Sequence, residues 1–174
     1  ELVEDYQNYC SEEGLLPRDD VLRAVPCRMS HEDNTAFDLY YAPSSRDYRS
    51  HQFLGIYYHK SIRHIGRLRK EVVVDRINGE LRLKDGDTKT LTADEKQRVH
   101  DAMDAGAERG WDIETGHKFF LVSQFYDTDF KKTSKHGMRK NQYFSLRDAL
   151  GMDKSNNLSD VESIADQLKS ESWT

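Results

Sequence analysis

Residues 53–83 of the chain read FLGIYYHKSIRHIGRLRKEVVVDRINGELRL. The aromatic and β-branched run Phe53–Tyr58 is typical of a strand, and a second strand is expected after a turn at residues 59–61, through Gly66 to Asp75. Asn78-Gly79 then stands between two apolar runs. This dipeptide favours a two-residue hairpin turn because both central positions need positive φ. The stretch therefore predicts consecutive antiparallel strands.

The residues before this stretch predict one or two short helices and one strand. Residues 1–33 carry apolar residues at helical spacing, then Gly14 and Pro17, and then an apolar stretch from Val21 to Val25. Residues 35–42 suit a strand that Pro43 and the polar residues after it end. We expect residues 1–33 to form an N-terminal helical segment.

The residues after the hairpin predict two helices and two more strands. A capping box at residues 92–95 opens a helix to about Arg109, which ends at Gly110. Its expected inward side chains are Val99, Ala102, Met103 and Ala107. Residues 118–126 and 142–146 suit strands. A second capping box at residues 159–162 opens a C-terminal amphipathic helix.

Together these elements predict an α+β fold, with a small, curved, mostly antiparallel sheet or partial barrel and flanking helices. We expect five to six strands. The predicted organisation is an N-terminal helical segment at residues 1–33, an α+β domain at residues 34–151 and a C-terminal helix at residues 152–174, packed on or beside that domain. A chain of 174 residues is long enough for one such domain.

The sequence shows neither a membrane span nor a secretion signal. No run of 18 apolar residues occurs, and the first residues lack the basic and apolar regions of a signal peptide. Cys10 and Cys27 stand outside any zinc or disulfide spacing, so we expect reduced packing residues. We expect a soluble cytoplasmic protein. The start at Glu1 indicates processing or a domain of a longer polypeptide, of which we favour the second.

The charge is unevenly distributed along the chain. The formal net charge of −5 disfavours a simple polybasic binder. Residues 59–70 and 131–140, however, hold ten of the 26 Lys and Arg and no acid. Folding does not require such concentrations of like charge, so a polyanion such as a nucleic-acid backbone is one reason for them. The alternative is two solvated loops whose cations pair with nearby acids.

The two basic segments define a candidate phosphate-binding surface, provided that the fold brings them together. Counterion release and charge-assisted hydrogen bonds would supply the affinity, and hydroxyl and backbone N–H groups would add neutral donors. The candidate residues are Lys60, Arg63, Arg67, Lys131, Lys132, Ser134, Lys135, Arg139 and Lys140.

Aromatic residues are numerous enough to stack on a nucleobase. The candidates are Tyr57, Tyr58, Trp111 and Tyr126. Because side chains alternate along a strand, Tyr57 and Tyr58 face opposite sides, and one of them is expected to leave the core just before the basic turn. Ordinary core packing is the alternative for each of the four.

Metal or acid chemistry has less support in the sequence. Asp112 and Glu114 followed by Lys118 resemble the carboxylates and lysine of metal-dependent nucleases, but the usual compact acid-x-lysine element on one strand is absent. No HExxH or GxSxG motif occurs. We assign no catalytic residue, no metal ligand and no cofactor, which favours a protein that is not an enzyme.

Two stretches resemble the PUA-like group of domains, which includes the ASCH, EVE, YTH and SRA types. They are residues 53–68, FLGIYYHKSIRHIGRL, and residues 119–134, in which TDFKKTS follows closely on FFLVSQFY. The likeness spans about residues 36–146 and lies in the order of the strands and the types of residue that they contain. It implies a small curved barrel that binds RNA or DNA, in some members by reading a modified base in an aromatic pocket. It also implies a non-catalytic module fused to, or associated with, a nuclease or ATPase of a restriction or defence protein.

The leading hypothesis is a nucleic-acid-binding module with DNA or RNA as its partner and no membrane role. Two alternatives stay open. One is a metal-dependent nuclease domain that uses Asp112, Glu114 and Lys118. The other is a protein-interaction domain whose basic loops dock on an acidic partner.

Overall fold

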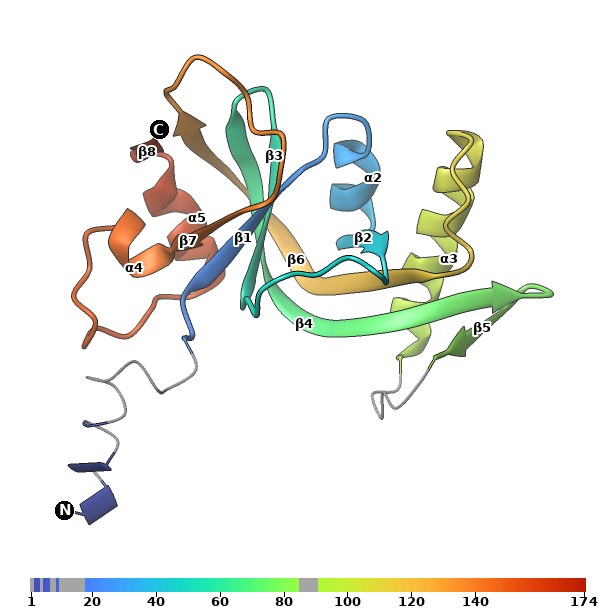
Figure 1. The fold of residues 1–174 in the computed structure, drawn as a ribbon, viewed down its shortest axis with the longest axis horizontal. Coiled ribbons are helices and arrows are strands. Elements are labelled where there is room, and N and C mark those ends of the chain that lie inside the picture. Colours follow the sequence, from blue (N-terminus) through green and yellow to red (C-terminus); the bar gives the residue numbers. More distant parts are fainter. Residues whose placement is uncertain (1, 4, 7–8, 10–17, 85–90) are drawn as a thin grey trace.

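The computed structural model describes residues 2–3, 5–6, 9, 18–84 and 91–174. The expectations for Cys10, Gly14 and Pro17, and most of the helical spacing before them, lie outside these residues. Within the described residues, eight strands form one open, mostly antiparallel sheet and four helices flank it (Figure 1). The predicted α+β class is confirmed.

The sheet has the order β2-β6-β4-β3-β1-β7, with β5 paired to β4 and β8 paired to β6. β1 runs parallel to β3, and β8 runs parallel to β6, whereas the other pairs are antiparallel. The strands are β1 (Val21–Pro26), β2 (Leu39–Pro43), β3 (Phe53–Tyr58), β4 (Ser61–Ile77), β5 (Glu80–Leu83), β6 (His117–Lys132), β7 (Gln142–Ser145) and β8 (Ser172–Trp173).

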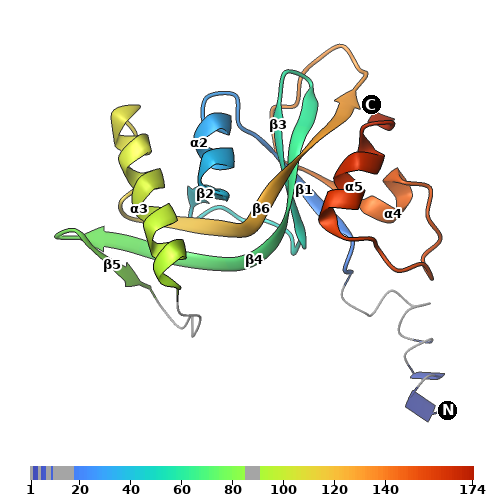
Figure 2. The ribbon, with the colours of Figure 1, turned by 180° about the vertical axis from the view of Figure 1, so that it is seen from behind.

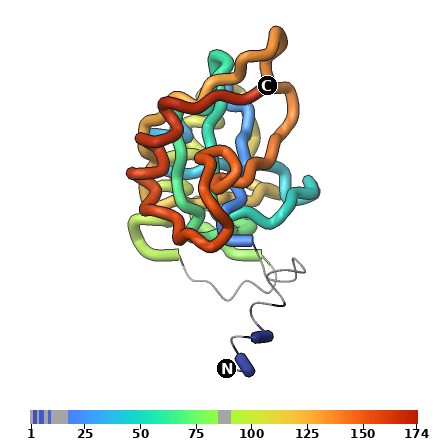
Figure 3. Tube along the Cα trace, turned by 90° about the vertical axis from the view of Figure 1, so that its left-hand side faces the viewer, coloured from blue at the N-terminus to red at the C-terminus, as the bar shows by residue number. Residues whose placement is uncertain are grey.

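The helices of the described residues are α2 (His31–Ala36), α3 (Ala93–Glu108), α4 (Leu146–Ala149) and α5 (Val161–Leu168). Of the four helices, α3 and α5 pack on the sheet at its two ends, and α2 lies between them next to β2 and β3. Figure 2 shows α3 and α5 in front of the two ends of the long β4–β6 pair. In Figure 3, α4, α5 and the C-terminal residues lie in front of the sheet. The same face of the sheet therefore carries both long helices.

Three apolar clusters form the core. Because side chains alternate along β6, Phe119 and Leu121 face α3, whereas Phe120 and Val122 face the opposite side of the sheet. The cluster under α5 includes Phe53, Ile62, Phe130, Ile164 and Trp173; the cluster under α3 includes Val72, Val99, Met103 and Phe119; the cluster on the opposite face includes Val25, Leu54, Ile56, Phe120 and Val122.

The locally encoded elements agree with the sequence. Asn78 and Gly79 have φ values of 52° and 80° and join β4 to β5, so the predicted hairpin is confirmed. Thr92 and Glu95 form the predicted capping box at the start of α3. Val99, Ala102 and Met103 are buried as predicted, but Ala107 is exposed and Gly106 faces the core instead.

The helical prediction for residues 1–33 is wrong at residues 21–26. These residues form β1, which lies between β3 and β7. A strand with neighbours on both sides reads as a continuous apolar run, which periodicity cannot separate from a buried helix segment. The predicted strand at residues 35–42 begins later, because α2 extends to Ala36 and β2 starts at Leu39. The C-terminal helix is capped by Asp160 rather than Ser159, and β8 was not predicted.

Candidate functional site

The two basic segments meet where β3 turns into β4. Ser61 at the start of β4 pairs with Lys131 at the end of β6, and the Lys132 N–H donates to the Lys60 carbonyl oxygen at 2.8 Å. The loop that follows β6 lies beside the β3–β4 turn in Figures 1 and 2. The Met138 N–H donates to Tyr57 Oη at 3.0 Å, which ties this loop to β3. The fold therefore places the start of residues 59–70 next to Lys131 and Lys132 and near the loop that follows them.

Two residues of the turn between β3 and β4 have a backbone conformation that is rare for residues other than glycine. His59 and Lys60 have φ values of 48° and 59°, a left-handed region that favours glycine. Each such non-glycine residue costs about 1–2 kcal/mol relative to an ordinary conformation. Both side chains are exposed. Strain of this kind concentrates at binding and catalytic sites, which makes the turn a candidate site in its own right.

Buried Arg23 in β1 holds the far end of the loop after β6. With the Asn141 amide oriented to satisfy its hydrogen bonds, its oxygen accepts from Arg23 Nη2 at 2.9 Å and Nε at 3.3 Å. The guanidinium lies 4.9 Å from the centroid of the Phe120 ring and 5.0 Å from that of Tyr48. The loop is thus fixed at Met138 and at Asn141, which positions the cations between β6 and β7.

Some of the cations at this end are already paired. Asp129 accepts from Ser61 Oγ at 2.7 Å and lies 3.2 Å from Lys131 Nζ and 3.5 Å from Arg63 Nη1. The hydrogen bond from Ser61, followed by the charges of Lys131 and Arg63, holds the pKa of Asp129 below its usual range. Arg63 and Lys131 therefore have part of their charge neutralised locally.

Six other cations near the β3–β4 turn have no ion pair with any acid among the described residues. We call these six, together with Lys131, the basic end. The Lys132 ammonium lies 5.0 Å from the centroid of the Trp173 ring. Ser134 Oγ, in the same loop, is buried without a hydrogen-bond partner in the described part of the chain. The basic end consists of Arg28, Lys60, Lys131, Lys132, Lys135, Arg139 and Lys140.

A pocket of about 320 Å³ opens beside the basic end. Tyr57 is buried in its wall, and Tyr58 is half-buried with its ring stacked on His31 at a centroid distance of 3.9 Å. Because His31 covers one face of Tyr58, a nucleobase would have to displace the imidazole to stack there. The pocket is lined by Pro26, Arg28, Tyr57, Tyr58, His59, Lys60, Gly137 and Met138.

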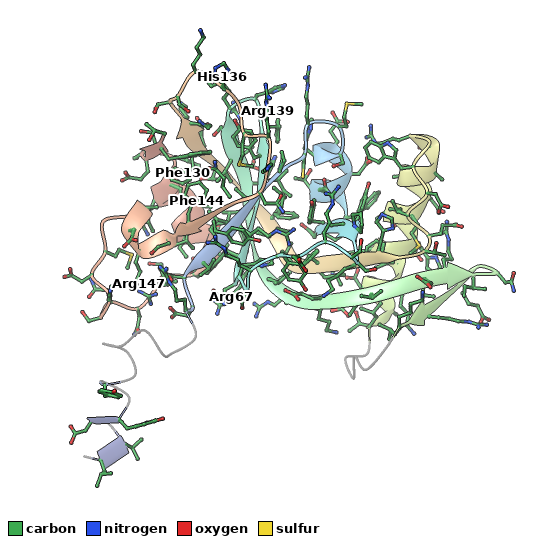
Figure 4. The ribbon with its side chains drawn as sticks, viewed as in Figure 1. Arg67, Phe130, His136, Arg139, Phe144 and Arg147 are labelled. Carbon is green, nitrogen blue, oxygen red and sulfur yellow. The ribbon has the colours of Figure 1, made fainter. Side chains whose placement is uncertain are left out.

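Three of the sequence candidates lie away from the basic end. Figure 4 shows Arg67 well below His136 and Arg139, on the lower side of the molecule in this view. The guanidinium of Arg67 lies 5.4 Å from the centroid of the Phe53 ring. Trp111 packs against the cluster under α3, and Tyr126 packs against the cluster under α5.

The residues of the nuclease alternative are engaged in separate contacts. Glu114 Oε1 accepts from Arg76 Nε at 2.8 Å, and Lys118 Nζ contacts the hydroxyl of Tyr48. Asp112 accepts from the backbone N–H of Glu114 at 3.2 Å. In the described residues, no group of three or more His, Cys, Asp or Glu side chains is placed to hold a metal ion.

Sequence reasoning missed Arg28 and Met138, which line the pocket, and His31, which stacks on Tyr58. Arg28 and His31 belong to a stretch that was expected to be helical. The one signal in the sequence is the charge of Arg28 next to Cys27. This charge indicates a place near the β3–β4 turn only when β1 is known to pair with β3.

Comparison of the chain with family models, with curated proteins and with solved structures found no match. Within the described residues, no helix combines the length and apolar character needed to cross a bilayer. By its fold and site, the protein is an α+β domain with an open, mostly antiparallel sheet and one cation-rich end.

Proposed function

We propose that this protein binds nucleic acid through the basic end. The observation that carries the proposal is the pairing of β4 with β6, which places Lys60, near the start of one acid-free segment, next to Lys132 in the other. Cations that lack an acidic partner gain most from contact with phosphate, because counterions are released when the backbone binds. A strained turn and a pocket at the same place suit a bound ligand better than a plain solvated face.

The charge of the remaining chain would orient the ligand. Outside residues 59–70 and 131–140 the chain has 16 Lys and Arg against 31 Asp and Glu. A polyanion is repelled by most of that surface and attracted by the basic end, so one docking orientation is favoured. The pocket beside Lys60 is wide enough to take an unpaired base while the cations hold the backbone.

In keeping with the resemblance to PUA-like domains, we propose that this module works in the cytoplasm with a nuclease or ATPase of a restriction or defence system. The pocket beside Lys60 would then bind a modified base.

The test is the salt dependence of binding to labelled double-stranded DNA. The variant Lys60→Gln/Lys135→Gln/Arg139→Gln removes three exposed cations of the basic end. The matched control, Arg82→Gln/Lys96→Gln/Lys154→Gln, removes three exposed cations from β5, α3 and the loop before α5. If each basic-end cation contacts one phosphate, the slope of log K against log salt shrinks by about 2–3 in the first variant. The control is expected to keep the slope of the unmodified protein.

Equal slopes in the two variants would contradict a phosphate site at the basic end. Parallel titrations with single-stranded DNA and with RNA identify the preferred nucleic acid. Absence of binding to all three, together with salt-sensitive association with an acidic protein, would favour the protein-interaction alternative instead.

A further inference from the structure

Tyr58, His64 and Asp127 form a chain of hydrogen bonds next to the β3–β4 turn. Tyr58 Oη lies 2.9 Å from His64 Nε2, and His64 Nδ1 lies 2.9 Å from Asp127 Oδ1. Because a carboxylate only accepts, His64 Nδ1 carries the hydrogen and donates it to Asp127. In a neutral imidazole Nε2 is then the acceptor, so the Tyr58 hydroxyl donates to it. Hydroxyl, imidazole and carboxylate stand in the order of a nucleophile, its base and the group that orients the base.

Irregular strand pairing places two functional side chains at Tyr58. The register of β4 shifts against β3 after Ile56 and against β6 between Ile62 and His64. In a regular strand, Arg63 and His64 would face opposite sides of the sheet. Here His64 reaches the Tyr58 hydroxyl, while the Arg63 guanidinium carbon lies 6.0 Å from the centroid of the Tyr58 ring. β-Bulges often re-aim side chains in this way next to active sites.

The Tyr58 ring is held on one face by His31 and at its hydroxyl by His64. The His31 ring stacks on it at 3.9 Å with an interplanar angle of 18°, and the His64 ring lies at 5.8 Å with an angle of 23°. The side chain of His64 is 18% exposed and that of Asp127 is 87% exposed, so the chain of hydrogen bonds reaches the surface. A phenol fixed in one orientation at the surface is preorganised for reaction.

The protonation states suit a base-activated phenol. Burial raises the pKa of Tyr58 and lowers the pKa of His64. At neutral pH the phenol therefore keeps its proton and needs a base, and the imidazole is in the neutral form that accepts one. Lys60 and Arg28 line the pocket that Tyr58 also lines, where they can stabilise negative charge on a phosphoryl group.

We propose that Tyr58 is a nucleophile that attacks the phosphorus of a nucleic-acid phosphodiester, with His64 as its general base and Asp127 as the positioning residue. The bond between Tyr58 Oη and phosphorus forms while the bond from phosphorus to the leaving oxygen breaks. The phenolic proton passes to His64 Nε2 and then to the leaving oxygen. The products are a phosphotyrosyl protein and a free hydroxyl end, and attack by that hydroxyl or by water releases Tyr58. This activity rests on the proposed function, since the basic end would supply the phosphodiester.

The test uses a small probe, the p-nitrophenyl ester of thymidine 5′-monophosphate. This phosphodiester has a good leaving group and needs no extended contact with the basic end. The expected result is a burst of nitrophenolate that approaches one equivalent per protein, with a thymidylyl group located on Tyr58 by peptide mass spectrometry. Tyr58→Phe is expected to abolish both signals. His64→Gln is expected to slow the burst by about 10²–10⁴-fold, the range for loss of a general base.

A matched control is Tyr41→Phe, which makes the same chemical change in β2. The Tyr41 hydroxyl is buried without a hydrogen-bond partner in the described residues, so its loss should leave the burst unchanged. Circular dichroism of each variant checks the fold. Asp127→Asn is expected to lower the burst rate and shift its pH profile, because Asp127 no longer stabilises the imidazolium form of His64.

Absence of a burst in the folded protein, or an equal burst in Tyr58→Phe, overturns the proposal. This result can be told apart from the salt-dependence experiment, because the mononucleotide probe needs only Arg28 and Lys60 beside Tyr58 and not the other cations of the basic end. Nucleic-acid binding without a burst therefore removes only the catalytic inference. A burst at Tyr58 without binding to DNA or RNA removes the proposed function and, with it, nucleic acid as the natural phosphodiester.

Discussion

Trp173 fastens the C-terminal end of the chain to the strand that carries the basic end. The residue is 9% exposed, and its ring centroid lies 4.9 Å from that of Phe144 and 6.1 Å from that of Tyr57. The indole N–H donates to the Phe130 carbonyl oxygen at 3.3 Å. The carbonyl oxygen of Trp173 accepts from the Thr133 N–H at 2.7 Å. We expect Trp173→Ala to be among the most destabilising substitutions in this molecule.

The magnitude follows from the buried area. A tryptophan side chain buries about 200 Å², and at about 25 cal/mol per Å² this contributes about 5 kcal/mol as an upper limit. Alanine keeps part of the contact, and a two-residue strand near the chain end can relax into the space. The expected loss in the free energy of unfolding is therefore about 3–4 kcal/mol, within the range for such truncations.

The assay is urea unfolding followed by far-ultraviolet circular dichroism, with the midpoint and the slope m compared between variants. Trp111→Ala is the matched control, because Trp111 is only half-buried against the cluster under α3. About half the loss is expected there. A loss below about 1 kcal/mol at Trp173, or a larger loss at Trp111, would refute the view that the aromatic cluster around β8 holds this end of the sheet together.

Three further predictions concern the sheet, a helix and the pH dependence of stability. Gly66→Ala is expected to lower the free energy of unfolding by about 1–3 kcal/mol, because a Cβ there would lie 2.9 Å from Val122 Cβ; an unchanged urea midpoint would contradict this. Thr92→Ala removes the cap that accepts from the Glu95 N–H at 3.2 Å and should cost about 1 kcal/mol, seen as a lower melting temperature. Burial lowers the pKa of His51 below its ordinary value of 6.5, so the unfolded chain binds a proton that the folded protein does not. The contribution of neutral His51 to the free energy of unfolding should therefore be fully present above about pH 6.5 and be lost as the pH falls below it. Urea titrations at about pH 7.5 and about pH 5.5 should show a smaller loss of stability at the lower pH in His51→Gln than in the unmodified protein.

Local elements could be read from the sequence because a few neighbouring residues encode them. The Asn78-Gly79 turn and the capping box at Thr92 depend on backbone conformations within four residues, and both occur as predicted. β1 could not be read in this way. Its residues are apolar on both sides and even include buried Arg23, so only the presence of β3 and β7 on its flanks makes it a strand.

The candidate site was predicted in part. The basic segment at residues 59–70 looked like one patch, but in a strand ten residues extend over about 33 Å. Lys60 therefore joins the basic end, whereas Lys70 reaches Glu95 at 2.7 Å at the start of α3. Tyr58 and His64 could not be linked from the sequence, because the bulge that aims His64 at the hydroxyl breaks the two-residue period on which such reasoning depends.

The sequence by itself determined the α+β class, the hairpin, the cap of α3 and the concentration of positive charge in two short segments. Only the tertiary structure decided which of these charges meet. Lys60 and Lys132 are 72 positions apart, and their contact depends on the register of β4 against β6, which is set by burial on both faces of the whole sheet rather than by either segment.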